Sequence, residues 1–119
     1  MSTRILRINS EIQKIVSEII STELRNPLIN GLISVSRVDT TNDLSISKIY
    51  ITIFNADDKE EVFNQIAHSA GFIRKELGHR IDLRKTPYLE FILDESLDYS
   101  NQIEEVIQKI NEKREKDEV

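Results

Sequence analysis

A dense cluster of cationic side chains stands in the second half of the sequence. Five of them fall within twelve residues: Arg74, Lys75, Arg80, Arg84 and Lys85. Only Glu76 and Asp82 oppose them there, although the whole chain has a formal net charge of −5. Phosphate groups are attracted by a local patch of cations rather than by the total charge of a protein. The cluster therefore predicts contact with the phosphates of RNA, against the alternative of ordinary solvated surface charge.

Further candidates for phosphate contact lie outside this cluster or between its members. His79 could assist a contact, and Arg4 and Arg7 stand three residues apart on one face of a predicted helix. Arginine suits this chemistry because its planar guanidinium can hold a phosphate through two hydrogen bonds. The predicted RNA-binding residues are Arg4, Arg7, Lys48, Arg74, Lys75, His79, Arg80, Arg84 and Lys85.

The seven aromatic residues do not interleave with these cations. The phenylalanines fall mostly on predicted core stripes, and the tyrosines are expected to pack at the edges of the core. Base stacking on exposed rings is a common way to bind single strands. Because the aromatic residues do not alternate with the cations, the sequence favours recognition of RNA shape and phosphate over readout of bases.

Catalytic chemistry has little support in the sequence. His68 and His79 have no partner set typical of a metal site or a catalytic triad. The carboxylate pairs at 57–58 and 60–61 suit the start of a helix, where the dipole favours negative charge. The chain has no cysteine and no glycine-rich phosphate loop. We expect a protein that is not an enzyme and needs no metal or cofactor.

The elements that position the cations begin with an amphipathic helix. Its apolar residues recur at steps of three and four from Ile5 to Ile19, and Asn26-Pro27 is expected to end it. Two strands, near 31–38 and 44–54, are expected to form an antiparallel hairpin across the turn residues 39–43.

A helical segment capped by Asp57 or Asp58 should follow the hairpin, and Gly78 is expected to end the helical region. A third strand is predicted near 88–94. The last predicted helix carries Ile103, Val106, Ile107 and Ile110. Residues 111–119 are polar and expected to fray.

The helical region between the second and third strands is expected to bend at Ser69, Ala70 and Gly71. Small side chains would let two helices meet there, and glycine tolerates backbone angles that other residues avoid. The alternative is a tolerated glycine within one helix. Beyond the bend the helix should run from Phe72 to His79 and bury Phe72, Ile73 and Leu77. On this reasoning Gly71→Val should lower stability.

The predicted fold class is α+β, with the order α-β-β-α-kink-α-β plus a C-terminal helix and a three-stranded sheet covered by helices. This matches a type II KH-like domain, although no two glycines stand three apart, so no GXXG loop exists. The predicted organisation is a single KH-like domain over residues 1–110 and a polar tail over 111–119. No apolar run is long enough to span a membrane, and the absence of cysteine fits a reducing cytoplasm, where we expect the protein to be. No coiled-coil seam or exposed apolar run requires a partner, so we expect a monomer.

Several ordered segments resemble the ribosome-binding factor A family, bacterial assembly factors of the small ribosomal subunit. They are RILRINSEIQKIVSEIISTEL, RNPLINGLISVSRVDTTNDLSISKIYIT and AGFIRKELGHRIDLRKTPYLEFILDES. The family has a KH-like fold in which an Ala-x-Gly kink replaces GXXG. Here Ser69 stands at the first kink position, and Ser47 replaces a usual alanine on the second strand. Both replacements are small and should be tolerated.

The resemblance implies a function without catalysis. It implies binding to the free or immature 30S subunit and its 16S rRNA, help in late maturation including 5′-end processing, and a role in cold adaptation. It also implies release assisted in some bacteria by a ribosome-associated GTPase. Two other functions stay open: a protein-protein adaptor without RNA contact, and an enzyme with an unrecognised site.

Overall fold

The structure is a computed structural model that describes residues 2–96 of the 119-residue chain. Its elements are α1 (Thr3–Thr22), β1 (Leu32–Thr40), β2 (Ile46–Phe54), α2 (Lys59–His68), α3 (Ala70–Arg80) and β3 (Tyr88–Leu93). The predicted last helix at 103–110, the end of the predicted domain and the tail at 111–119 lie outside the described residues.

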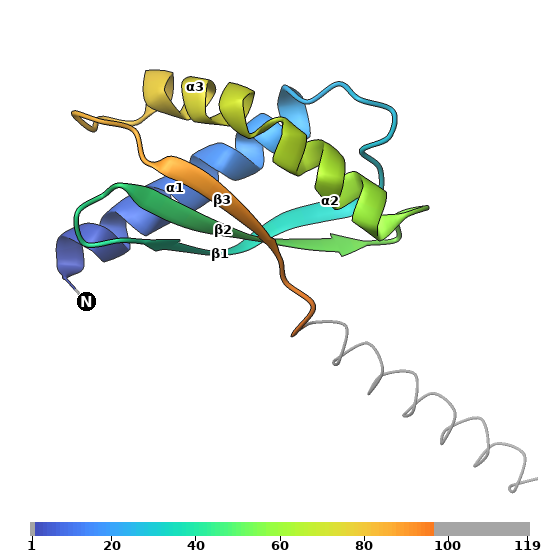
Figure 1. Ribbon diagram of the computed structural model, residues 1–119, viewed down its shortest axis with the longest axis horizontal. Coiled ribbons are helices and arrows are strands. Elements are labelled where there is room, and N and C mark those ends of the chain that lie inside the picture. The colour runs from blue at the N-terminus through green and yellow to red at the C-terminus, as the bar shows by residue number, and fades with distance from the viewer. Residues whose placement is uncertain (1, 97–119) are drawn as a thin grey trace, which may run out of the picture.

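The three strands form one mixed sheet in the order β1-β2-β3. β1 and β2 are antiparallel, which confirms the predicted hairpin, whereas β2 and β3 are parallel. Parallel strands need a long crossover, and α2 and α3 supply it. Figure 1 shows all three helices on one face of the sheet. The predicted α+β class and the sheet covered by helices are confirmed.

A single core lies between the helices and the inner face of the sheet. From the apolar stripe of α1, Ile12, Val16 and Ile19 are fully buried there. β2 contributes Ile49 and Ile51 to the same core. Burying each such side chain stabilises the fold by about 1.5–3 kcal/mol, so this core holds the surface elements in place.

A β-bulge interrupts the alternation of β1. The register passes from Val35 opposite Ile51 directly to Arg37 opposite Tyr50, which leaves Ser36 outside the pairing register. Inward-facing residues therefore stand three apart at the bulge rather than two apart. Val35 and Val38 are both buried for this reason.

Two helix ends differ from their predicted positions. α1 stops at Thr22, before Asn26-Pro27, and the N–H of Glu23 caps it by donating to the carbonyl of Ile19. The proline therefore does not end this helix. α3 continues through Gly78 to Arg80, so this glycine does not end the helical region. The predicted start of α2 is correct, because the Asp58 carboxylate accepts from the N–H of Glu61.

α2 and α3 meet at Ser69, the one residue between them (Figure 1). Gly71 lies inside α3 without a positive φ, and a Cβ built on it meets nothing within 4 Å. Neither the backbone angle nor the space around a Cβ therefore requires glycine at this position, and the loss of stability expected for Gly71→Val stays a prediction. Phe72 is also 42% exposed rather than buried, although Ile73 and Leu77 are buried as predicted.

Candidate nucleic-acid interface

Three of the predicted cations meet at one end of the molecule, where the start of α1 lies beside the loop between α3 and β3. Arg4, Arg84 and Lys85 line a surface hollow of about 440 Å³ there. The remaining lining residues are Asp43, Leu44, Ser45 and Leu83. The fold thus unites two basic segments about eighty residues apart in the sequence. We call this hollow the cationic hollow.

The loop from 81 to 87 holds Arg84 and Lys85 outward because its apolar residues are anchored inside. Leu83 packs against the core, and Pro87 is fully buried. Between these anchors Arg84 and Lys85 are both exposed. The described residues offer neither side chain a hydrogen bond or an ion pair. Both cations are therefore free to bind a phosphate.

Asp43 is the one carboxylate that lines the cationic hollow, and it is held by its own turn. Hydrogen bonds from the Ser45 and Thr41 hydroxyls, and then from the N–H of Ser45, lower the pKa of Asp43 to about 2. The carboxylate is therefore ionised at neutral pH. Three cations against this one anion leave the hollow positive.

Arg74, a predicted RNA contact, is directed toward the protein itself. Its Nε donates to the carbonyl of Pro87 at 3.1 Å, and an Nη donates to the carbonyl of Thr86 at 2.8 Å. Its guanidinium also lies over the Tyr88 ring, 4.1 Å from the centroid. Arg74 therefore fastens the end of the 81–87 loop to α3. This loop carries the exposed side chain of Lys85.

Arg74→Ala is expected to lower the free energy of unfolding by about 2 kcal/mol, because two charge-assisted hydrogen bonds and a cation–π contact are lost. Arg74→Lys should recover little of this, since a compact ammonium cannot reproduce the planar fork. Urea denaturation measures the free energy of unfolding of both variants. Lys75→Ala removes the neighbouring exposed cation and should change stability by less than about 0.5 kcal/mol. Equal effects at positions 74 and 75 would contradict this role of Arg74.

Arg80 and Lys48 stand among carboxylates. Arg80 pairs with Glu23 at 3.1 Å and with Glu76 at 3.6 Å, so it joins α3 to the end of α1. The hollow that Arg80 lines also contains Glu11, Glu18 and Asp82. Lys48 is opposite Asp39 on β1 and opposite Glu90 on β3. Arg80 is therefore already paired with carboxylates, and Lys48 has a carboxylate residue opposite it on each neighbouring strand.

The other predicted cations are exposed on two helices. Lys75 and His79 lie on α3, and Arg7 lies on α1 one turn beyond Arg4. Lys75 lines a hollow of about 360 Å³ with Gly71, Arg74, Gly78 and Thr86. The nine predicted residues thus divide among several surfaces and do not form one patch.

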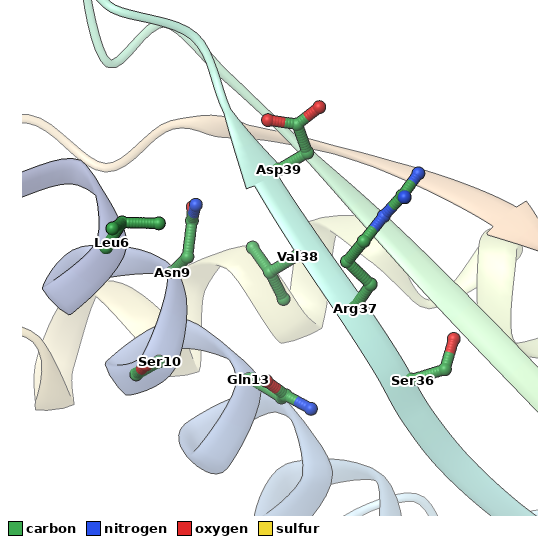
Figure 2. Close-up of a pocket in the computed structure, with 8 residues that line it drawn as sticks. All are labelled: Leu6, Asn9, Ser10, Gln13, Ser36, Arg37, Val38 and Asp39. Atoms are coloured by element: carbon green, nitrogen blue, oxygen red, sulfur yellow. The ribbon is translucent and has the colours of Figure 1, made fainter. Parts of the chain in front are cut away.

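A further hollow, of about 350 Å³, lies between α1 and the outer strand β1 (Figure 2). Gln13 bridges the two elements by donating to the carbonyl of Val35 at 2.9 Å. Arg37 points away from α1, and its guanidinium lies 4.1 Å from the centroid of the Tyr50 ring. The buried Oδ1 of Asn9 has no hydrogen-bond partner among the described residues. The Asp39 carboxylate among the lining residues disfavours phosphate, so this hollow is a poor anion site.

The family model for ribosome-binding factor A matches residues 4–107. The chain belongs to the ribosome-binding factor A family. Among curated members it is 42% identical to the Clostridium novyi (strain NT) protein over 115 residues, covering 96% of this chain and 95% of that protein. It is 39% identical to the Macrococcus caseolyticus protein over 112 residues, with 93% and 97% covered.

Solved structures of ribosome-binding factor A share the fold. The crystal structure of the Thermus thermophilus protein has a TM-score of 0.67 at 21% identity and covers 75% of this chain and 93% of its own. A solution structure of a putative ribosome-binding factor A from Thermotoga maritima has a TM-score of 0.63 at 24% identity, covering 77% and 88%. At such identities these likenesses establish the KH-like fold alone.

No helix in residues 2–96 is long and apolar enough to cross a membrane. No group of three or more His, Cys, Asp or Glu side chains in the same range could hold a metal ion.

Proposed function

We propose that this chain is a ribosome assembly factor that binds the free, immature small (30S) subunit through its 16S rRNA. In this proposal it assists late rRNA maturation, including processing of the 5′ end, by binding RNA and without catalysing a reaction. A homology model of the Thermus thermophilus ribosome-binding factor A was fitted into a cryo-EM map of a complex of 30S with that factor; it is similar to this chain with a TM-score of 0.62 at 22% identity over 73% of this chain and 91% of that one.

The observation that carries the proposal is the cationic hollow on an acidic chain. Arg4, Arg84 and Lys85 come from two separate segments and converge on one surface. Each guanidinium can hold a phosphate with two hydrogen bonds, and the ammonium adds a compact charge. Such a hollow fits the folded backbone of an RNA better than it fits an isolated base.

The distribution of charge along the molecule supports one docking orientation. Figure 1 shows the start of α1 and the loop after α3 at one end, and the start of α2 at the other. The first end carries the cationic hollow, whereas the start of α2 and the two residues before it hold four carboxylates, Asp57, Asp58, Glu60 and Glu61, around the single cation Lys59. RNA attracts the first end and repels the second, so contact through the hollow is favoured.

Two finer parts of the proposal are the oligomeric state, which follows from the sequence pattern, and the release, which the family resemblance implies. The factor acts as a monomer, and a ribosome-associated GTPase assists its release in some bacteria. Neither part alters the test of RNA binding.

The proposal is tested by sedimenting the purified protein with small subunits, large subunits and assembled ribosomes at two salt concentrations. Selective binding to free small subunits, weakened by salt, is the expected result, because phosphate contacts release counterions. Binding to none of the particles, or equal binding to all, would overturn the proposal. Binding to small subunits that does not respond to salt would favour the adaptor function.

A further inference from the structure

Asn9 lines the hollow between α1 and β1, and its side chain is unusual among the described residues. The residue is only 9% exposed, and its Oδ1 is buried without a hydrogen-bond partner. No other buried side-chain nitrogen or oxygen of the described residues is left in this state. An unpaired buried acceptor destabilises a fold, so this oxygen indicates a site where a donor from another molecule can bind.

Gln13 brings a second unused acceptor to the same hollow. Its Nε2 donates to the carbonyl of Val35 at 2.9 Å. Because a carbonyl oxygen only accepts, this bond fixes which end of the Gln13 amide is the nitrogen. The Oε1 at the other end receives no hydrogen bond from the described residues. Gln13 stands four residues after Asn9, so the two amides are neighbours on the surface of α1 (Figure 2).

Asp39 adds a negative charge from the β1 side of the hollow. Its carboxylate makes no hydrogen bond or ion pair with the described residues, although Lys48 is its partner in the β1–β2 register. Arg37 is the one cation among the lining residues. Its guanidinium is turned away from α1 and lies over the Tyr50 ring (Figure 2). The charge presented to the hollow is therefore negative.

Two apolar side chains complete the lining. Val38 is buried between α1 and β1, and Leu6 is 53% exposed beside Asn9. Such a surface suits the methylene stem of a long cationic side chain, which packs on apolar atoms while its charged head meets polar groups. A guanidinium carries five N–H donors and no acceptor, so it matches a site that consists of acceptors. A lysine ammonium is more compact and has fewer donors.

From this arrangement we infer that the hollow between α1 and β1 binds an arginine side chain of a partner protein, whose guanidinium donates to Asn9 Oδ1, Gln13 Oε1 and the Asp39 carboxylate. The stem of that arginine packs on Leu6 and Val38. The inference does not rest on the proposed function, because this hollow shares no lining residue with the cationic hollow. A phosphate is a poor occupant, since it offers acceptor oxygens and negative charge to a site that already has both.

The test uses the full-length protein labelled with nitrogen-15. It is titrated with the peptide acetyl-Gly-Arg-Gly-amide while NMR follows the side-chain amide signals of Asn9 and Gln13. Both signals are expected to shift and to saturate. The corresponding lysine peptide should bind several-fold more weakly, because one ammonium reaches fewer of the three acceptors. If the arginine peptide moves neither signal, the inference is wrong.

Asp39→Asn removes the charge with little change in size and should weaken binding of the arginine peptide several-fold. Asp57→Asn is the matched control, because Asp57 is an exposed carboxylate that lies before α2 and outside the hollow. It makes the same change in total charge and should leave the affinity unchanged. Equal affinities in the two variants would contradict the inference. Shifts of the Asn9 and Gln13 signals caused by a single-stranded oligouridylate but not by the peptide would show an RNA contact and also overturn it.

Asn9→Leu tests the unpaired oxygen separately. Leucine is close to asparagine in size and has no polar side-chain atom, so the melting temperature should rise. Binding of the arginine peptide, followed by the Gln13 signal, should weaken several-fold. A lower melting temperature would mean that the Asn9 oxygen supports the fold itself, and unchanged affinity would mean that no ligand uses it; either result contradicts the inference. The Asp39→Asn test stands even if Asn9→Leu does not fold, because the Asp39 carboxylate has no partner among the described residues.

Discussion

Replacing both Arg84 and Lys85 by glutamate is expected to weaken binding to the small subunit by about 100-fold or more, at about tenfold for each reversed charge. Both side chains are exposed at the cationic hollow and have no hydrogen bond or ion pair among the described residues, so little else changes. Sedimentation or filter binding over a series of salt concentrations measures the effect. The slope of log affinity against log salt should also decrease by about 2, roughly one unit for each lost phosphate contact.

A matched control reverses two exposed cations elsewhere. Lys14→Glu with Arg25→Glu changes the total charge equally but leaves the cationic hollow intact. It should retain most of the affinity. Similar losses in the two double variants would mean that total charge governs binding and that the cationic hollow is not the interface. Arg80 is unsuitable for such a test, because its reversal also breaks the ion pairs with Glu23 and Glu76.

Gly31→Ala is expected to lower the free energy of unfolding by about 3 kcal/mol or more. Gly31 directly precedes β1 and has a φ of +88°. Residues that carry a side chain rarely adopt this backbone conformation. A Cβ there would lie 2.5 Å from the carbonyl oxygen of Phe54 and 2.9 Å from the backbone nitrogen of Ala56. Backbone atoms cannot yield as a flexible side chain can, so the ends of β1 and β2 must separate. Chemical denaturation followed by circular dichroism measures the loss.

Gly71→Ala is the control for this measurement, because it makes the same chemical change where a Cβ meets nothing. It should leave stability unchanged or raise it by about 1 kcal/mol. If the two alanine variants unfold at the same denaturant concentration, the close contact at Gly31 does not constrain the fold.

The order of the elements could be predicted from the sequence because their signals are local. Apolar residues repeat at helical spacing in α1, and period-two alternation marks β2. Asp58 is a typical N-cap residue and so predicts where α2 begins. In the structure its carboxylate accepts a hydrogen bond from the N–H of Glu61, which confirms this start. The end of α1 was less predictable, since the helix stops at Thr22 before any residue that forbids continuation.

Burial at the bend could not be predicted by spacing alone. Phe72, Ile73 and Leu77 are all apolar, yet only the last two face the core. The direction of α3 after Ser69 decides which side of the helix meets the sheet, and tertiary packing sets this direction. The bulge at Ser36 similarly changes the inward-facing residues of β1 through its pairing with β2.

The sequence by itself determined that a basic segment exists on an acidic chain, that the fold is α+β, and that the family resemblance extends over most of its length. Only the tertiary structure decided which cations are available. Arg74 is bound to backbone carbonyls, Arg80 is paired with carboxylates, and Arg84 and Lys85 meet Arg4 from the first helix. The physical reason is that charge depends on residue type, whereas availability depends on partners brought close by segments far apart in the chain.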